Sequence, residues 1–336
     1  MKKILIIKPS GIGDIVHSLP VAIGLKKIFP ESTLHWLIFN KFASILKNVN
    51  YVDKIILWDR DGGIKEFFRV LNEIRREKYD LTIDLQGLLR TALLNRFSSA
   101  KSILATSLLR EFSWLLEKPI AKYDDNLHAV ERNYEVVKFL AKKEIPSPKK
   151  FLPWLETTKD EKEKAKKLLN GKSNIITFSV GSRGKHKIWP YENFIELINR
   201  MSKEIFFVPV FVGSKEEKYL VENIILGIVC PYINLVGETD LRDIVGVLEQ
   251  SKLVIGNDSG IIHIAAALNK PVLAIFGATN PKWYYPYNDN SRFIYKKYKC
   301  SPCDIKTNCK DYKCMKNISV DEVFDFFKKN FVLYLK

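Results

Sequence analysis

The chain is poor in the patterns that mark membrane, secreted or fibrous proteins. No run approaches the roughly 18–20 apolar residues that a membrane-spanning helix needs. Only four apolar residues separate Lys3 from Lys8, too few for a signal peptide. Apolar residues make up 46% and charged residues 27% of the 336 residues, which excludes a disordered chain, a collagen-like repeat and a coiled coil. We therefore expect a folded cytoplasmic protein.

Acidic residues are scarce relative to basic ones. The chain has 54 Lys and Arg against 38 Asp and Glu, a formal net charge of +16. Residues 1–155 carry 26 basic and 17 acidic residues (+9), and the rest carry 28 and 21 (+7), so the charge is not confined to a tail. Spread positive charge suits a phosphate-rich ligand, an anionic membrane face or nucleic acid. Solvated lysines on helix surfaces account for it equally well.

Apolar runs alternate with segments of helical period through both halves of the chain. This alternation is typical of parallel βαβ units and, with the length, predicts two doubly wound α/β domains. In the first half we expect strands at 3–7, 33–39, 54–58 and 81–84, and helices at 14–29, 42–47, 64–77, 88–97 and 128–142. In the second half we expect strands at 174–179, 206–211, 233–235, 253–255 and 272–276, with helices between them and a last helix at 319–330.

A proline-rich segment marks the domain boundary. Pro146, Pro148 and Pro153 lie close together, and each proline breaks helix and restricts the residue before it. We place an N-terminal domain at 1–153 and a C-terminal domain at 154–318. We expect the helix within 319–336 to return toward the N-terminal domain. Open α/β sheets bind ligands at the carboxyl ends of their strands, so a cleft between the domains is the expected site.

The first motif is Lys8-Pro-Ser-Gly-Ile-Gly-Asp14, where an apolar strand runs through a glycine turn into a helix. Gly11 and Gly13 permit tight geometry and close ligand approach. The third glycine of a dinucleotide fingerprint is missing, and no Gly-Lys-Ser/Thr of a phosphate-binding loop follows. Asp14 is either a first-turn carboxylate favoured by the helix dipole or a general base facing the cleft.

Two further motifs follow strands of the second half and suit an anion. The segment 178–190 places small residues and three cations after a strand, which suits pyrophosphate, although a flexible basic loop would look the same. The segment 254–267 joins a strand to Asp258-Ser-Gly260 and an alanine-rich helix, whose N-terminus offers N–H groups to an anion. His263 on this helix is either a buried structural residue or, as Asp-Ser-Gly beside it favours, a ligand contact.

Together these motifs resemble the bacterial ADP-heptose:lipopolysaccharide heptosyltransferases, glycosyltransferase family 9. Each motif is weak alone, but their order and spacing are specific and run over nearly the whole chain. The C-terminal cysteines make the chain closer to the heptosyltransferase II type. Further matching segments are Asp84-Leu-Gln-Gly-Leu88, His128-Ala-Val-Glu-Arg132, Val212-Gly-Ser-Lys-Glu-Glu217 and Gly237-Glu-Thr-Asp-Leu241.

The resemblance implies a GT-B fold, two Rossmann-like domains facing across a cleft. It implies an inverting, metal-independent transfer of heptose from ADP-L-glycero-D-manno-heptose to the inner core of lipopolysaccharide. The acceptor would be the lipid A–Kdo core at the inner membrane leaflet, and the enzyme cytoplasmic or peripheral on that membrane, with no nucleic-acid partner. Asp14 matches the general base that takes the proton of the acceptor hydroxyl. Lys187 matches the lysine that neutralises the diphosphate leaving group.

The other site residues follow from the same resemblance. Because a carboxylate repels a diphosphate, we give Asp258 a sugar-hydroxyl or turn-holding role. The basic, aromatic stretch 104–125 either leans on the membrane or is a packed insertion. The nucleotide-sugar site is expected to include Ser179, Gly181, Ser182, Gly213, Glu217, Thr239, Asp258, Ser259, Gly260 and His263. The acceptor site is expected to include Lys8, Ser10, Gly11, Gly13, Arg90, His128 and Arg132, whose arginines suit phosphate and carboxylate groups.

Four of the five cysteines are clustered near the C-terminus. Cys300, Cys303, Cys309 and Cys314 have the spacing C-x2-C-x5-C-x4-C, and Cys230 stands apart. Disulfides are disfavoured in the cytosol, so clustered thiols suggest a tetrahedral zinc or iron site. The family needs no metal for activity, so an ion here would be structural. Reduced thiols and disulfides stay open as alternatives.

Other functions compete with this interpretation. The nearest are a family 9 transferase using another nucleotide sugar or a protein acceptor, and a GT-B-fold UDP-sugar epimerase, which needs no acceptor. A nucleic-acid binder fits the charge, but the sequence has no helix-turn-helix pattern, RNP motif or basic aromatic stripe. A Rossmann oxidoreductase is disfavoured by the broken glycine fingerprint and by the lack of an acidic residue ending a second strand about 20 positions after Gly13.

Overall fold

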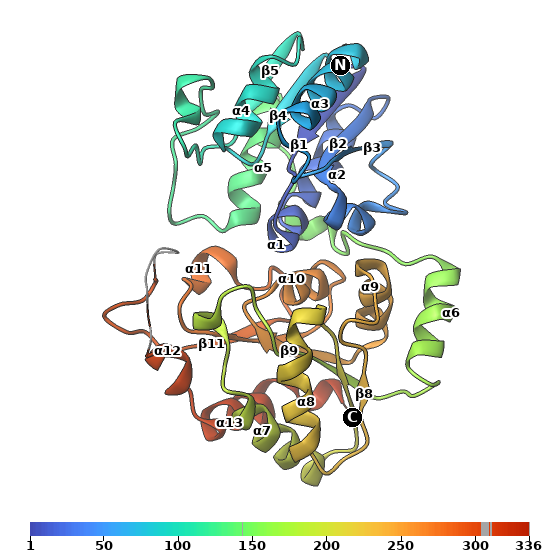
Figure 1. Cartoon of the computed structure of the whole chain (residues 1–336), viewed down its shortest axis with the longest axis vertical. Helices are drawn as coiled ribbons and strands as arrows, with labels where there is room; N and C mark the ends of the chain where they lie inside the picture. The colour runs from blue at the N-terminus through green and yellow to red at the C-terminus, as the bar shows by residue number, and fades with distance from the viewer. Residues whose placement is uncertain (143, 304–308, 310, 336) are drawn as a thin grey trace. The chain divides into compact units, whose positions relative to one another are not determined.

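The computed structural model describes residues 1–142, 144–303, 309 and 311–335 (Figure 1). The chain divides into two compact units, Met1–Trp154 and Leu155–Lys336. The division falls one residue beyond the boundary expected from the prolines. Each unit contains one parallel sheet covered by helices, as the alternation of strands and helices predicts.

The first unit is built on a five-stranded parallel sheet. The strand order is β3-β2-β1-β4-β5, so the direction in which the chain adds strands reverses between β1 and β4. In open α/β sheets ligands bind at the carboxyl ends of the strands beside such a reversal. The strands are β1 (Lys3–Ile7), β2 (Thr33–Phe39), β3 (Lys54–Trp58), β4 (Leu81–Asp84) and β5 (Ser102–Ala105).

Helices bury the apolar residues of this sheet. Alternate residues of the strands, such as Leu5 and Ile7, pack with Val70 and Ile74 of α3 and with Leu94 of α4. Helix α2 packs against α5. The helices are α1 (Ile12–Val16), α2 (Leu19–Ile28), α3 (Gly63–Glu77), α4 (Leu89–Arg96) and α5 (Ala129–Leu140), with short 3-10 helices η1 (Asn40–Leu46), η2 (Ser113–Leu115) and η3 (Pro148–Phe151).

The helix expected over 14–29 is in fact two helices. Helix α1 ends at Val16, and α2 begins at Leu19 with Pro20 in its second position. Proline is tolerated in the first turn because the N–H that it lacks would have no partner there. The break places Asp14 in a separate short helix directly after β1, and the Ser18 hydroxyl donates to the Asp14 carbonyl at 2.8 Å.

The second unit is built on a six-stranded parallel sheet of order β11-β10-β9-β6-β7-β8. Read from the other edge, this is the Rossmann order, with the reversal between β6 and β9. The strands are β6 (Ile175–Ser179), β7 (Val208–Phe211), β8 (Ile233–Asn234), β9 (Leu253–Asn257), β10 (Val272–Phe276) and β11 (Arg292–Tyr295). The sequence analysis does not predict strands β5 and β11; both are four-residue edge strands, with one buried residue in β5 and none in β11.

The last helix packs differently from the prediction. Helix α13 (Val320–Phe331) buries Val323, Phe327 and Phe331 in the core of the second unit, together with α7 and α8, rather than in the first unit. Its apolar side chains follow the helical period, and the side of β6 and β9 that bears Ile176 and Ile255 supplies the partner surface. The other helices are α6 (Lys159–Leu168), α7 (Tyr191–Glu204), α8 (Lys218–Gly227), α9 (Leu241–Gln250), α10 (Gly260–Ala267), α11 (Pro281–Tyr284) and α12 (Lys313–Lys316), with 3-10 helices η4 (Lys185–Lys187), η5 (Lys215–Glu217) and η6 (Val332–Tyr334).

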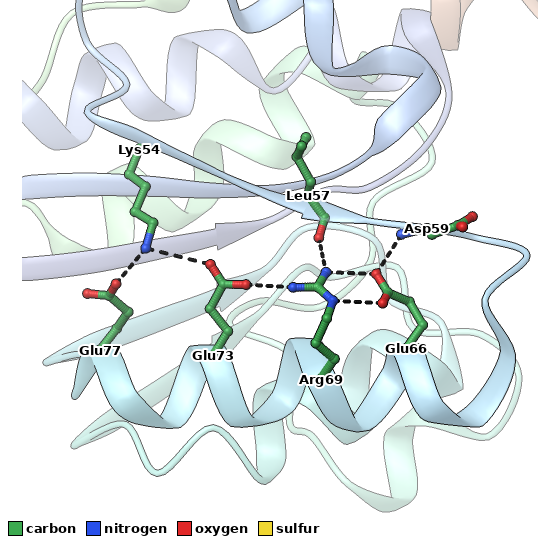
Figure 2. Close-up of polar contacts among 7 residues, drawn as sticks. All are labelled: Lys54, Leu57, Asp59, Glu66, Arg69, Glu73 and Glu77. Atoms are coloured by element: carbon green, nitrogen blue, oxygen red, sulfur yellow. Dashed lines mark hydrogen bonds and ion pairs between the residues drawn. The ribbon is translucent and has the colours of Figure 1, made fainter.

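A row of charged side chains ties α3 to the edge strand β3 (Figure 2). Arg69 donates to Glu66 at 2.7 Å, to Glu73 at 2.8 Å and to the carbonyl of Leu57 at 2.5 Å. Lys54 on β3 lies 2.7 Å from a carboxylate oxygen of Glu77. By occupying a carbonyl of the edge strand, Arg69 leaves one acceptor fewer for pairing with another chain.

Over the part of the chain that the structure describes, no helix combines the length and the apolar character needed to span a bilayer.

The packing of α3 predicts that its buried side chains stabilise the first unit more than its charges do. Ile74→Ala, which opens a cavity in the core, is expected to lower the free energy of unfolding by about 2–5 kcal/mol. Arg69→Met, which removes half-exposed ion pairs, is expected to cost no more than about 1 kcal/mol, and less at high salt. Urea unfolding followed by circular dichroism measures both. A larger midpoint shift for Arg69→Met than for Ile74→Ala would contradict this ranking.

Candidate active site

The loop after β1 brings a buried cation close to Asp14. Lys8 is 6% exposed and donates its Nζ to the Leu85 carbonyl, just after β4, at 2.8 Å. Burial lowers the pKa of Lys8, and the nearby carboxylates of Asp14 and Asp84 offset part of that effect. Lys8 therefore joins the ends of the two strands between which the sheet order reverses.

Asp14 is the carboxylate in this group without a partner. It lies half-buried in the first turn of α1, after the N-cap residue Gly11. Within the described residues, its carboxylate has no hydrogen bond or ion pair. A half-buried carboxylate beside a lysine, with its lone pairs unoccupied, is able to accept a proton from a bound hydroxyl.

The other residues predicted for the acceptor divide by exposure and contacts. His128 is buried and caps α5, its Nδ1 accepting from the Val130 amide at 3.1 Å. Arg132 is also buried and donates to the Leu127 carbonyl at 2.9 Å, and its charge contributes to lowering the pKa of Lys8. Arg90 is half-exposed over the ring of Phe39, 5.8 Å from the ring centre. Ser10 and Gly13 are also half-exposed, in the loop and first helix after β1.

Two charged residues near Lys8 were not among the predicted site residues. Asp84 ends β4 and is fully buried, and Arg110 lies close enough to Lys8 for its charge to lower the pKa of that lysine. The Nη2 of Arg110 also approaches the Gln86 carbonyl at 3.3 Å. The position of Asp84 at the end of an apolar strand is a signal that could have found it. Arg110 lies in an irregular segment, and nothing in the sequence pattern places it there.

In the second unit, the loop after β6 and the end of β9 meet in an ion pair. The Nζ of Lys187 donates to Oδ2 of Asp258 at 2.7 Å, and the Thr279 hydroxyl donates to the same oxygen at 2.7 Å. The Nε2 of His263 lies 3.7 Å from the other oxygen, Oδ1. Burial raises the pKa of Asp258, but His263 and Lys187 outweigh burial and hold it well below its usual range. The carboxylate is therefore charged and compensated.

Small polar residues hold the two loops together around this pair. The Ser182 hydroxyl donates to the Asp258 carbonyl at 2.8 Å, and the hydroxyls of Ser179 and Ser259 lie 2.9 Å apart. Ser259 precedes Gly260, the first residue of α10, whose leading N–H groups have no partner within the helix. These contacts fit a turn-holding role for Asp258, and they set a lysine and a helix N-terminus at the reversal of the sheet, where an anion binds favourably.

Glu217 lies beside the same group of loops. Its Oε2 accepts from the Ser214 amide at 2.8 Å, and burial raises its pKa. A Cβ atom at Gly181 or Gly213 would overlap the Glu217 carboxylate. Glycine at both positions therefore leaves the space that this carboxylate occupies. Thr239 lies further along the chain, where its hydroxyl donates to the Leu235 carbonyl at 3.3 Å.

The clustered cysteines do not form a complete ligand set in the structure. Among the described residues, which include all five cysteines, no group of three or more His, Cys, Asp or Glu is placed to hold a metal ion. The loop residues 304–308 and 310 lie outside the described part. Burial, and then the charges of Cys303, Cys300 and Cys309, raise the pKa of the Cys314 thiol to about 11. The four sulfurs are thus near enough to influence one another, and the metal site stays a prediction.

The sequence is similar to known glycosyltransferases over most of its length. The sequence matches the model of glycosyltransferase family 9 (heptosyltransferase) over residues 67–313. The lipopolysaccharide heptosyltransferase 1 of Campylobacter coli is 32% identical over 290 residues, covering 82% of this chain and 84% of that protein. The lipooligosaccharide heptosyltransferase 2 of Haemophilus ducreyi is 29% identical over 313 residues, covering 87% and 88%.

The solved structures give the same fold. The structure of the E. coli ADP-heptose lps heptosyltransferase II matches with a TM-score of 0.81 at 22% identity, covering 99% of both chains. This confirms the predicted α/β, GT-B class. The sequence relatives include both first and second heptosyltransferases, so the order in which this chain would act stays open. With the family model matched over most of its length, the chain belongs to glycosyltransferase family 9 and is a glycosyltransferase.

Proposed function

We propose that this glycosyltransferase moves a heptose from ADP-L-glycero-D-manno-heptose to a hydroxyl group of the lipopolysaccharide inner core. The relatives named for this activity cover more than four fifths of the chain, which supports heptosyl transfer in core biosynthesis. The proposal adds inversion at the anomeric carbon, Asp14 as the general base and no catalytic metal.

The observation that carries the proposal is the state of Asp14. Its carboxylate lies at the carboxyl end of β1, half-buried, next to Lys8, and it has no partner among the described residues. The other buried carboxylates near the two strand reversals, Asp84 and Asp258, accept hydrogen bonds from the protein. Asp14 is thus the one in this comparison that is free to receive an external proton.

The chemistry then divides between the two units. Asp14 accepts the proton of the acceptor hydroxyl while its oxygen forms a bond to C1 of the heptose. The bond from C1 to the diphosphate oxygen breaks on the opposite face, and the electron pair leaves with ADP. Lys187 and the N-terminus of α10 stabilise the charge that develops on the diphosphate. Because Lys187 already compensates Asp258, that carboxylate does not face the diphosphate as an isolated negative charge.

The acceptor side carries the charges that an anionic core needs. Lys8, Arg110 and Arg132 lie near one another in the first unit and suit the carboxylate and phosphate groups of the lipid A–Kdo core. Phe112, Trp114 and Leu115 are exposed by 62%, 53% and 75% on and before η2. Exposed aromatic and aliphatic side chains of this kind suit contact with the membrane leaflet that holds the acceptor, as a peripheral enzyme would require.

The first test is to remove the base. Asp14→Asn keeps the shape of the side chain but accepts no proton, so kcat for transfer should fall about 10²–10⁴-fold. ADP affinity should stay within about twofold, because the nucleotide contacts come from the second unit. Product formation from ADP-heptose and a heptose-free core acceptor, followed by mass spectrometry, measures kcat. Glu31→Gln, an exposed carboxylate of the same unit, is the matched control. Normal turnover by Asp14→Asn would refute the assigned role.

The second test concerns the leaving group. Lys187→Ala removes the cation and leaves Asp258 with only Thr279 and His263 as partners, so ADP should bind on the order of tenfold more weakly and kcat should fall about 10²–10³-fold. Calorimetric titration and initial rates give the two values. Lys185→Ala, which changes an exposed lysine two residues away, should leave both values near wild type. Unchanged ADP affinity in Lys187→Ala would argue against its contact with the diphosphate.

The cysteine segment gives an independent prediction. If Cys300, Cys303, Cys309 and Cys314 hold a structural ion, elemental analysis of protein purified without a histidine tag should find about one Zn or Fe per chain. Cys303→Ser should release that metal, because a metal needs thiolate ligands, and Cys230→Ser, outside the cluster, should not. Metal-free protein with full activity would eliminate the site.

A further inference from the structure

The first unit buries two carboxyl groups, those of Asp84 and Glu117. If both were ionised, no hydrogen would lie between them to form a hydrogen bond. Asp84 ends β4 and is fully buried, and Glu117, just after η2, is 5% exposed. Oδ2 of Asp84 and Oε2 of Glu117 are both buried without a donor from the surrounding protein. Two carboxylate oxygens left this way cost desolvation energy that a shared proton removes.

The surrounding hydrogen bonds decide which carboxyl group carries that proton. Nδ2 of Asn95 donates to the Leu104 carbonyl at 3.0 Å and also to Oε1 of Glu117, so this Glu117 oxygen is an acceptor. The Asn95 amide cannot be turned round, because the Leu104 carbonyl can only accept. Oε2 is thus the Glu117 oxygen left for a proton.

Asp84 is the better site for the negative charge. Its Oδ1 accepts from the amides of Gln86 at 2.7 Å and Gly87 at 3.1 Å, and the ammonium of Lys8 lies close by. Burial raises the pKa of Asp84, but the two amide hydrogen bonds and the charge of Lys8 oppose that effect and favour the ionised form. Glu117 accepts a hydrogen bond only from Asn95, and burial, and then the charge of Asp84, raise its pKa to about 8. Asp84 is consequently the acceptor of the pair.

We propose that Asp84 and Glu117 share one proton, with the Oε2–H of Glu117 donating to Oδ2 of Asp84, and that this pair is a positioning device for Lys8 beside Asp14. The acid–carboxylate bond holds the 84–87 turn. Lys8 binds the carbonyl of Leu85 within that turn. Glu117 acts through Asp84 and the turn, and does not itself touch a substrate.

The turn leaves little room for another arrangement. Gly87 has a φ of 66°, and a Cβ atom there would overlap the Leu108 carbonyl oxygen, so only glycine fits without strain. The Gly87 carbonyl accepts from the Arg110 amide at 2.8 Å and from the Ser113 hydroxyl at 3.1 Å. The segment that carries Glu117 is therefore fastened to the same turn at several points, and loss of the shared proton would strain it there.

The charges around the pair come from four parts of the unit. Asp84 faces Glu117 from β4, and Asn95 faces it as a neutral amide from α4. Lys8, after β1, lies near Asp84, and Arg110, before η2, lies near Lys8. Lys8 favours an ionised Asp84 and so a neutral Glu117. Folding thus binds a proton at Glu117 that the unfolded chain, with an ordinary pKa of 4.5, releases. This contribution to stability is complete below that pKa and is lost as pH rises through the raised pKa of Glu117.

The chain offers a neutral replacement with the same hydrogen-bond pattern. In Glu117→Gln, Oε1 accepts from Asn95 and Nε2 donates to Asp84, as the protonated acid does. This variant should keep wild-type kcat near neutral pH to within about twofold. Its unfolding midpoint in urea should no longer fall with rising pH as steeply as that of wild type. Glu117→Leu, which leaves both partners unsatisfied, should unfold at lower urea. Glu111→Gln, at an exposed carboxylate of the same segment, is the matched control and should behave as wild type.

Infrared spectroscopy detects the proton without substrate. Wild type at neutral pH should show the C=O band of a buried protonated carboxylic acid, and Glu117→Gln should lack it. Asp84→Asn should also lack it, because the new amide donates to Glu117 and lets that group ionise. A band that survives in Glu117→Gln, or an unfolding midpoint in that variant that falls with pH as in wild type, would overturn the shared proton.

The positioning role rests on the proposed function and has its own readout. As pH rises through the raised pKa of Glu117, wild-type kcat for heptosyl transfer should fall, and Glu117→Gln should not show this alkaline limb. An identical limb in both proteins would overturn the positioning role even if the infrared result held. A chain that transfers no heptose at any pH would refute the proposed function and leave the infrared and unfolding tests of the pair intact.

Discussion

The ion pair between Lys187 and Asp258 fixes the geometry on which the second unit's site depends. Asp258 is almost fully buried, and a buried carboxylate is tolerated only when donors surround it. Lys187, Thr279 and His263 supply these contacts from the loop after β6, the segment after β10 and helix α10. The contacts that stabilise the Asp258 carboxylate therefore hold three segments together at the strand reversal and orient Lys187 there. The same contacts leave a cation at the strand reversal, where we propose that the diphosphate binds.

In the first unit, too, buried charged groups at the strand ends need hydrogen-bond partners. Lys8 and Asp84 are buried at the ends of β1 and β4, and each is hydrogen bonded to the protein. Asp14, in the first turn of α1, has no such bonds among the described residues. A parallel sheet gathers strand ends at one edge, so polar residues that must follow each strand collect there. Because Asp84 has these hydrogen bonds and Asp14 has none within the described ranges, the two carboxylates differ chemically.

The sequence predicts the central elements well because their signals are local. The strands at 33–39, 54–58 and 272–276 have the expected bounds, since each is a mainly apolar run that polar residues, proline or glycine close on both sides. The edge strand β5 is short and part-exposed, so it lacks such a run. The break between α1 and α2 depends on Pro20, whose place in a first turn could have been recognised. The packing of α13 depends on which distant surface is apolar, and helical periodicity does not contain that information.

The site residues divide in the same way. The sequence names Asp14, Lys187 and Asp258 as candidates because each lies in a compact motif beside a strand end, and their roles stay predictions. The pairing of Asp258 with Thr279 spans 21 positions and that of Asn95 with Glu117 spans 22, and neither spacing forms a pattern. The protonation of a buried carboxyl group depends on all the groups that surround it. The proposed proton on Glu117 can therefore be inferred only once its neighbours are known.

The most direct test of the central claim is a set of parallel calorimetric titrations with ADP, UDP and NAD, without added divalent metal. If the chain transfers heptose from an ADP-linked donor, ADP should bind selectively and metal should not be required. Selective binding of UDP would contradict the account and favour another sugar transferase or an epimerase, and binding of none of the three would contradict the assignment of a nucleotide site around Lys187 and α10.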